Sequence, residues 1–385
     1  MLGGLPAGFI SVPAGLGFLS GVFLLICVRD RNFWQLMPYE KVGLLLLIWL
    51  AISGLWSQAG LKETLVGLED YHIFLMLPVA SWVLSLTERG PYWVGAGALA
   101  GAILSLAISY MLGLGVIDIP GYTLSLGNRI YHAQIMACLL IVGVSLTLIS
   151  TDSRRAIGIG LFVAAFCNLL FIETGRTGYL IAIGVTVGVI GVYLPWKRTV
   201  AIGACLVLAV GFGYQFNDKF KNRVDQTLEN GQRALFEKHY KSSAGLRIEW
   251  WRGAVKLGME QPIFGRGIGD VKADLTALYK QDQMREWTRN VHNEYLHLLL
   301  AGGFVAVFLI IGFVSTLIIS GRRVLRQLPL VGLCLVGAGL MTGIAGLFNS
   351  TIMNFSTKYV LIIMLIITGG LIRRQYQPVT RVRKI

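Results

Sequence analysis

Charged residues are scarce in this chain. Only 14% of its 385 residues are Asp, Glu, Lys or Arg, whereas 55% are hydrophobic. Soluble globular domains carry about 25% charged residues, so the composition excludes an ordinary soluble protein. Apolar runs of about 20 residues, the length that crosses a hydrocarbon core of roughly 30 Å, recur along the sequence. The sequence therefore predicts an all-α, polytopic membrane protein.

We expect eleven of these runs to be transmembrane helices. The first contains Pro13 and several glycines, and the total becomes twelve if it consists of two short segments. About eight helices fall in residues 1–216 and about three in residues 292–385, separated by a polar segment at residues 217–291. The expected spans are 7–28, 41–56, 65–86, 91–114, 130–150, 156–172, 178–195, 199–216, 292–320, 327–349 and 358–373.

The polar segment contains no cysteine, although it holds 14 Lys/Arg and 10 Asp/Glu residues. All five cysteines lie inside apolar runs, so we expect no disulfide in this segment. The chain also lacks any Asp-x-Asp pair and any His, Asp and Glu set with the spacing of metal ligands. We therefore expect no metal and no cofactor, and arginine must neutralise any phosphate that the protein handles.

Acidic residues are especially rare in one set of loops, which holds 16 Lys/Arg against 4 Asp/Glu. The rest of the chain holds 18 Lys/Arg against 16 Asp/Glu, so the positive-inside rule makes the first set cytoplasmic and puts the polar segment outside. The net charge of +14 thus reflects orientation and contact with anionic membrane lipid, and does not argue for nucleic acid. The cytoplasmic set comprises 29–41, 87–90, 151–155, 196–198, 321–326 and the tail after 372.

Three short outer loops each carry a basic residue. Lys62 precedes the third run, Arg129 opens the fifth and Arg176 opens the seventh. Glu69 and Asp70 fall inside the third run, where ionisable groups are costly and are usually functional or paired. Either this acidic pair serves a site, or it pairs with Lys62 or Arg129.

The polar segment is expected to be mainly helical. One amphipathic helix starts at Ser242 or Ser243 and stops at Pro262, and a second lies within residues 269–287. The glycine-rich turn between them follows no strand, which argues against a nucleotide-binding loop. Either the turn only connects the helices, or its amides and Arg266 contact an anion.

Two aromatic and two basic residues cluster on the first of these helices: Arg247, Trp250, Trp251 and Arg252. One interpretation is an interfacial helix, with tryptophans at headgroup depth and arginines facing lipid phosphate. The alternative, which we favour for Arg247, is a direct role in function.

His292 opens the apolar run that follows the polar segment. In the first turn of a helix, the helix dipole disfavours the imidazolium and keeps the ring neutral. A neutral imidazole can accept a proton, whereas the same helix end also attracts anions. His292 is therefore a general base, a hydrogen-bond donor to phosphate, or an interfacial histidine without a role.

With these motifs, the chain resembles the bacterial O-antigen ligases, whose superfamily also contains O-antigen polymerases and protein O-oligosaccharyltransferases. The ligases carry an outer arginine with a leucine four positions on, and a histidine at the end of a large periplasmic loop that is followed by glycine. A loop arginine and a Pro-x-x-Gly-x-Gly turn complete the pattern. The matching residues are Arg176, Leu180, Arg247, Pro262, Gly265, Gly267, His292 and Gly303.

The resemblance implies a membrane-embedded glycosyltransferase of the GT-C type in the bacterial inner membrane, with its active site facing the periplasm. It would move O-antigen polysaccharide from undecaprenyl pyrophosphate to a sugar hydroxyl of lipid A-core. The family is usually described with twelve spans, so the expected eleven is a departure.

The mechanism that the resemblance implies is metal-independent and inverts the configuration of the transferred sugar. Arg176 and Arg247 would stabilise the departing pyrophosphate, since guanidinium groups bind phosphate in bidentate fashion. Arg129 and Arg266 are weaker candidates for the same role. His292 would be the general base that deprotonates the acceptor hydroxyl.

Three other functions stay open. An O-antigen polymerase or a protein O-oligosaccharyltransferase would use the same scaffold, but polymerases tend to have two sizeable outer loops and the transferases more periplasmic mass near the C-terminus. A lipid or glycan transporter would instead place charges at mid-span, and apart from the patch at Glu69 and Asp70 the runs show none.

Overall fold

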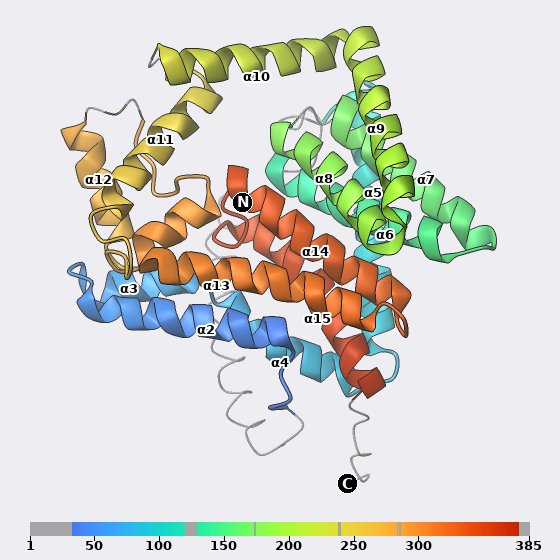
Figure 1. Ribbon diagram of the computed structural model, residues 1–385, viewed down its shortest axis with the longest axis horizontal. Coiled ribbons are helices and arrows are strands. Elements are labelled where there is room, and N and C mark those ends of the chain that lie inside the picture. Colours follow the sequence, from blue (N-terminus) through green and yellow to red (C-terminus); the bar gives the residue numbers. More distant parts are fainter. Residues whose placement is uncertain are drawn as a thin grey trace.

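A computed structural model describes residues 33–119, 129–172, 175–237, 240–282, 284 and 286–376, and these residues form helices without a strand (Figure 1). The first expected span, 7–28, and most of the basic tail lie outside the described residues.

Seven helices in the described part of the chain are long and apolar enough to cross a membrane. Two of them continue into tighter or wider turns: α2 runs on into the 3-10 helix η2, and α7 into the π-helical η3. The prediction of a polytopic helical membrane protein is confirmed. The seven are Pro38–Trp56 (α2 and η2), Gly90–Gly113 (α5), Arg129–Ile149 (α6), Ser153–Ile172 (α7 and η3), Trp196–Phe216 (α9), Glu294–Val324 (α13) and Pro329–Phe348 (α14).

Two further helices, α8 (Arg176–Tyr193) and α15 (Phe355–Tyr376), occupy the runs expected at 178–195 and 358–373. The run at 65–86 is different, because α3 (Gly60–Glu69) ends before a turn and α4 (Ile73–Ser85) begins after it. The prediction of one continuous span there is wrong.

Helix α3 ends where two side chains donate hydrogen bonds to its last carbonyl groups. The His72 Nδ1 donates to the Glu69 carbonyl at 2.5 Å, and the Lys358 Nζ donates to the Asp70 carbonyl at 2.9 Å. Carbonyls at a helix end need such partners when no further turn supplies them. The break therefore depends on a lysine that lies 288 residues further along the chain.

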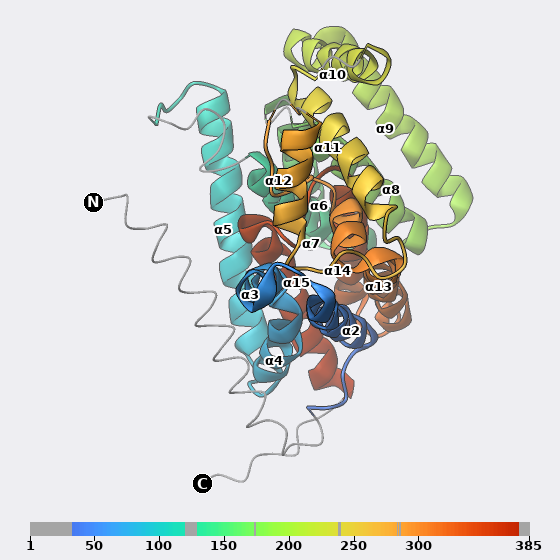
Figure 2. The ribbon, with the colours of Figure 1, turned by 90° about the vertical axis from the view of Figure 1, so that its left-hand side faces the viewer.

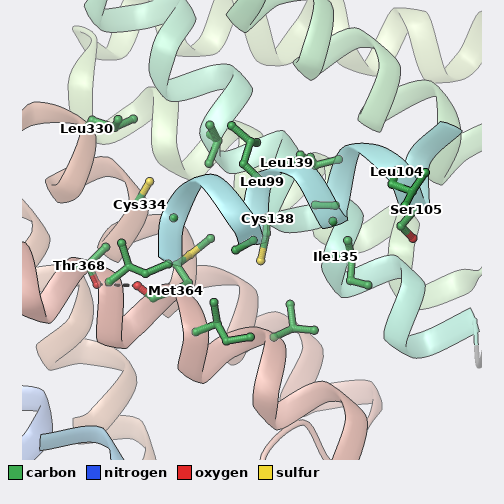
Figure 3. A pocket seen from close by; sticks show the side chains of 18 of the residues that line it. Leu99, Leu104, Ser105, Ile135, Cys138, Leu139, Leu330, Cys334, Met364 and Thr368 are labelled. Carbon is green, nitrogen blue, oxygen red and sulfur yellow. Dashed lines mark hydrogen bonds between the residues drawn. The ribbon is translucent and has the colours of Figure 1, made fainter. Parts of the chain in front are cut away.

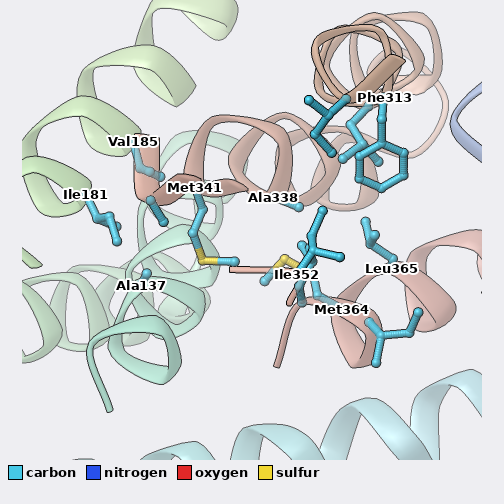
Figure 4. Packing of buried hydrophobic residues seen from close by; sticks show 14 of the residues in the cluster. Ala137, Ile181, Val185, Phe313, Ala338, Met341, Ile352, Met364 and Leu365 are labelled. Atoms are coloured by element: carbon cyan, nitrogen blue, oxygen red, sulfur yellow. The ribbon is translucent and has the colours of Figure 1, made fainter. Parts of the chain in front are cut away.

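The core of the bundle is built around α14, which packs against α13, α8, α6 and α15. Figure 4 shows Met341 and Ala338 of α14 between Val185 of α8 and Phe313 of α13. In α14, 72% of the apolar window is buried, against 6% in α9. Helix α9 thus lies at the periphery with few buried residues, whereas α14 packs between its neighbours.

A cavity of about 560 Å³ lies between α5, α6, α14 and α15 (Figure 3). Its walls are almost wholly apolar, and they include Cys138 and Cys334. The Thr368 hydroxyl at its edge already donates a hydrogen bond to the Met364 carbonyl at 2.9 Å. This cavity therefore offers nothing for phosphate chemistry.

The polar segment forms the cap, which we define as residues 217–293. It contains α10 (Asp218–Phe236), α11 (Ser243–Gly258) and α12 (Val271–Gln281). Helix α10 crosses one end of the molecule from α9 to α11 (Figures 1 and 2). As expected, α11 begins after Ser242, whose hydroxyl accepts from the Gly245 amide at 3.1 Å.

The glycine-rich turn of the cap fits into a break in α13. Gly303 has φ 67°, a non-helical conformation that leaves helical amides without their usual acceptors. The Pro262 carbonyl accepts one of them, from Phe304 at 2.7 Å. Gly265, with φ 72°, lies so close that a Cβ on it would fall 2.6 Å from the Gly302 nitrogen. The turn is therefore a connector that ties the cap to α13.

The same part of the cap also holds the link between α2 and α3. The Asp270 carboxylate accepts from the amides of Gln58 at 2.9 Å and Ala59 at 2.6 Å. Gly267, with φ 106°, packs against the Ser53 carbonyl oxygen, 2.9 Å from where a Cβ would lie. The cap is consequently fixed to the bundle at two places.

Candidate active site

His292 lies just outside α13, because Asn293 is the N-cap and the helix begins at Glu294. The expectation that His292 belongs to the first helical turn is wrong. Its backbone adopts φ 52°, a left-handed conformation that is uncommon for a residue with a Cβ. Such conformations persist where surrounding contacts over-determine them, often at functional sites.

The His292 ring is held from two sides. Its Nδ1 lies 3.2 Å from the Asn349 Oδ1, and its face stacks on Trp250 with ring centroids 5.4 Å apart. Burial lowers the pKa of His292; the bond to Asn349 opposes this shift and the nearby charge of Arg247 adds to it. Burial, rather than the helix dipole, thus favours the neutral ring.

Hydrogen bonds join the segment around His292 to the end of α14. The Asn290 Oδ1 accepts from the His292 amide at 2.8 Å and from the Ser350 hydroxyl at 2.6 Å. At the N-cap of α13, the Asn293 Nδ2 donates to the Leu347 carbonyl at 2.9 Å. These bonds pair two segments that are almost 60 residues apart in the sequence.

Glu294 extends this pairing. Its side chain is 2% exposed, and its carboxylate accepts from the Ile352 amide at 2.9 Å and from the Tyr71 hydroxyl at 3.3 Å. The turn after α14 and the turn between α3 and α4 are therefore both anchored beside His292.

The two tryptophans of α11 hold the end of the cap. The Trp251 Nε1 donates to the Val291 carbonyl at 2.8 Å, and the Trp250 Nε1 donates to the Glu286 carbonyl at 3.0 Å. Trp250 is only 9% exposed, so the interpretation of Trp250 as a headgroup anchor is wrong. Their role is to support the residues that lead to His292.

Arg247 lies on the same helix and is mostly buried, which lowers its pKa. Among the described residues it has no hydrogen-bond or ion-pair partner, and its charge acts on His292. It lines a cavity of about 330 Å³, the Arg247 cavity, whose other walls come from the start of α8, from α10 and from Phe348. A guanidinium without a partner in such a place is suited to an anionic ligand.

Arg176 is the first residue of α8, and Thr177, Tyr179 and Leu180 after it line the Arg247 cavity. The structure therefore brings the start of α8 and the part of α11 that carries Arg247 to one cavity. Leu180 belongs to the wall of this cavity.

The other two arginines are placed differently. The Arg266 guanidinium binds Asp274 at 2.6 and 3.0 Å and Glu260 at 2.5 Å, which raises its pKa. Two carboxylates thus occupy the donors that a phosphate would need. Arg129 opens α6 as an exposed residue and does not line the Arg247 cavity.

The acidic residues of the third run have a partner that the sequence did not suggest. The Asp70 carboxylate lies 4.0 Å from the Lys358 Nζ, and neither Lys62 nor Arg129 pairs with it. Burial raises the pKa of Asp70 to about 6, although Lys358 opposes the shift. Lys62 and Glu69 are exposed.

Sequence reasoning missed the residues that position His292: Asn290, Glu294, Asn349 and Ser350. Each lies at the end of an apolar run, where polar residues usually cap helices, so nothing local marks them. A cluster of polar residues at both run ends, "RNVHNE" and "FNSTIMN", is the only signal that the sequence offers.

No curated protein matches the chain. Residues 139–311 match the family model described as O-antigen ligase. The matched stretch contains α8, the whole cap and the first half of α13, and with them Arg176, Arg247, His292 and Gly303. The resemblance drawn from the sequence motifs is thereby confirmed, because the match covers the part of the chain that builds this site.

Proposed function

We propose that the protein transfers O-antigen polysaccharide from undecaprenyl pyrophosphate to a sugar hydroxyl of lipid A-core at the periplasmic face of the inner membrane. The observation that carries the proposal is Arg247, a buried guanidinium without a partner in the described residues. It lies beside the neutral ring of His292 and in one cavity with the start of α8, where Arg176 lies.

The reaction is a single displacement at the anomeric carbon. The acceptor oxygen forms a bond to this carbon while the bond to the pyrophosphate oxygen breaks, so the configuration inverts. The leaving pyrophosphate keeps the electron pair, and the hydroxyl proton passes to His292. General base catalysis of this kind contributes roughly 10² to 10⁴ in rate.

Arg247 and Arg176 would stabilise the charge that develops on the leaving group. Guanidinium donors that are already in place cost no reorganisation during the reaction, and mostly apolar walls strengthen their effect. The Arg247 cavity, at about 330 Å³, has room for a pyrophosphate and an adjoining group, but not for the polysaccharide. The glycan and most of the lipid chain would therefore extend beyond it.

One ion pair argues against a transporter. It is buried between helices of the described bundle and lies away from the cap. Arg373 donates to Glu40 at 2.5 Å, and the two side chains are 1% and 0% exposed. The Ser81 hydroxyl donates to the same carboxylate at 2.6 Å. This pair fastens α2 and α15 to α4, a structural role that requires no path through the bundle.

The proposal is tested with purified protein in nanodiscs, given carrier-linked glycan and lipid A-core with EDTA present. We expect glycan on lipid A-core, and losses of at least about 100-fold in His292→Ala and Arg176→Ala. Growth of glycan on the carrier alone would show a polymerase. A requirement for divalent metal, or near-full activity in both variants, would overturn the mechanism.

A further inference from the structure

Building on the function proposed above, we infer that Asn349 is a positioning residue that fixes the tautomer of His292. The Asn349 Oδ1 accepts a hydrogen bond from His292 Nδ1–H, which leaves the lone pair of Nε2 to take the acceptor proton. During transfer, the O–H bond of the acceptor breaks as the Nε2–H bond forms, and the electron pair of the hydroxyl goes to the anomeric carbon.

With the Asn349 Oδ1 facing the ring, the contact fits one tautomer. An amide oxygen carries no hydrogen and only accepts, so the 3.2 Å contact is a hydrogen bond only when Nδ1 bears the hydrogen. A neutral imidazole has one N–H, and Nε2 is then a pure acceptor. Among the described residues, nothing bonds to Nε2.

The ring has little freedom to exchange its two nitrogens. Trp250 covers one face, with ring planes 28° apart. The backbone of His292 is fixed in the left-handed region, where its amide donates to Asn290 at 2.8 Å. Nδ1 therefore keeps pointing at Asn349.

Asn349 is held by burial and by its backbone. It follows the last residue of α14, is 0% exposed, and donates its backbone N–H to the Ala345 carbonyl at 2.8 Å, while its side-chain Nδ2 has no partner among the described residues. On either side of it, the Leu347 carbonyl is held by Asn293 and the Ile352 amide by Glu294. Partners that orient metal-bound histidines affect activity about 10- to 100-fold, and we expect an effect of the same size for a histidine base.

This arrangement decides between the two roles that the sequence left open for His292. With the hydrogen on Nδ1, a neutral His292 has no donor at Nε2 to offer a phosphate. Binding of the pyrophosphate then falls to the arginines, and the free nitrogen is a base. The assignment predicts different defects for the two residues. Asn349 variants should lower kcat with KM for the donor nearly unchanged, whereas Arg247 variants should lower kcat/KM because the leaving group loses its stabilisation.

The first test measures the tautomer without any turnover. Histidine ring ¹⁵N shifts are recorded on the full-length, labelled protein in nanodiscs, with His292→Gln identifying the signal among five histidines. We expect the Nδ1–H form, and a pKa that rises by roughly one unit in Asn349→Asp, where a carboxylate replaces the amide. An Nε2–H form in the wild-type protein would overturn the inference.

The second test measures transfer as a function of pH. Asn349→Ala should lower kcat about 10- to 100-fold with KM for the donor changed less than about twofold. Asn349→Asp should move the acid limb of kcat upward by about one pH unit, because a raised pKa keeps His292 protonated to higher pH. A residue that only supports the fold would leave that limb in place.

The matched control is Asn222→Asp on exposed α10, which adds the same charge to the cap. It should leave both the limb and kcat unchanged. An Asn349→Ala variant with kcat within about twofold of wild type overturns the positioning role. If wild-type protein forms no product, the proposed function fails, while the ¹⁵N shifts still decide the pairing of Asn349 with His292.

Discussion

Gly303 and Gly265 meet backbone to backbone: a Cβ on Gly303 would lie 2.6 Å from the Gly265 nitrogen. One glycine follows His292 by eleven positions and the other belongs to the turn after α11, so two motifs that are separate in the sequence form one joint. The joint sets where the cap lies on α13. It therefore helps to hold α11, which carries Arg247, against α13, which begins just after His292.

Alanine at either glycine should destabilise the protein. Each has a left-handed φ, which costs an alanine about 1–2 kcal/mol, and steric overlap adds about 1–3 kcal/mol. Thermal unfolding in detergent should show a clear fall in Tm for Gly303→Ala and Gly265→Ala. Gly97→Ala on α5, which has open space around it, is the control. Equal Tm values for all three would refute a tight joint.

Loss of Arg247 should affect transfer and not stability. Arg247→Ala removes a buried charge without a described partner, so Tm should stay level or rise, while kcat/KM falls about 10²- to 10³-fold. Lysine, which lacks the planar fork, should recover only part of this activity. Steady-state transfer assays with unfolding curves for each variant provide the measurement.

Arg252→Ala is the matched control, because Arg252 is on the same helix but exposed, where it donates to Tyr240. It should retain activity within about twofold. If Arg252→Ala and Arg247→Ala lost activity equally, the effect would belong to α11 as a whole and not to an anion site.

Much of the fold follows from local sequence. The thickness of the hydrocarbon core sets the length of an apolar run, so most spans were placed correctly, and Ser242 marked the start of α11 because capping is a local property. The break after Glu69 was not predictable, since it depends on Lys358 from the last helix.

In the site, too, local sequence indicates some residues, whereas others become apparent only from contacts between distant segments. Motif spacing and orientation point to Arg176, Arg247 and His292. Arg266, a weaker candidate for binding an anion, instead binds Asp274. That pair is eight residues apart across a turn, a separation that no helix or strand period indicates. Asn349 came from a different apolar run, so only the packing of α13 on α14 reveals that it contacts His292.

Transfer should lose its base only at a pH below the ordinary histidine range. Burial lowers the pKa of His292 from its usual value of about 6.5, so the neutral ring persists to lower pH than in water. The acid limb of kcat/KM should lie below pH 6.5 and vanish in His292→Gln, together with most activity. A limb at pH 7 or above would mean that a raised pKa, or another group, controls the reaction.

Asp70 should make stability depend on pH in the opposite sense from an ordinary ion-paired carboxylate. Burial raises the pKa of Asp70 to about 6, so the folded protein binds a proton here more tightly than the unfolded chain does. The contribution of Asp70 to the free energy of unfolding is therefore fully present below the unfolded pKa and is lost as pH rises through 6. Asp70→Asn should therefore be neutral or raise Tm at pH 7.5, and lose that advantage at pH 5.

The effect of Asp70 should be small, about 1 kcal/mol or less, because the side chain is 36% exposed and water screens it. Unfolding curves of wild type and Asp70→Asn at pH 5 and pH 7.5 measure it, with Glu69→Gln, an exposed neighbour, as the control. If Asp70→Asn instead lowered Tm more at pH 7.5 than at pH 5, attraction to Lys358 would outweigh burial. The turn between α3 and α4 would then be held by a true ion pair.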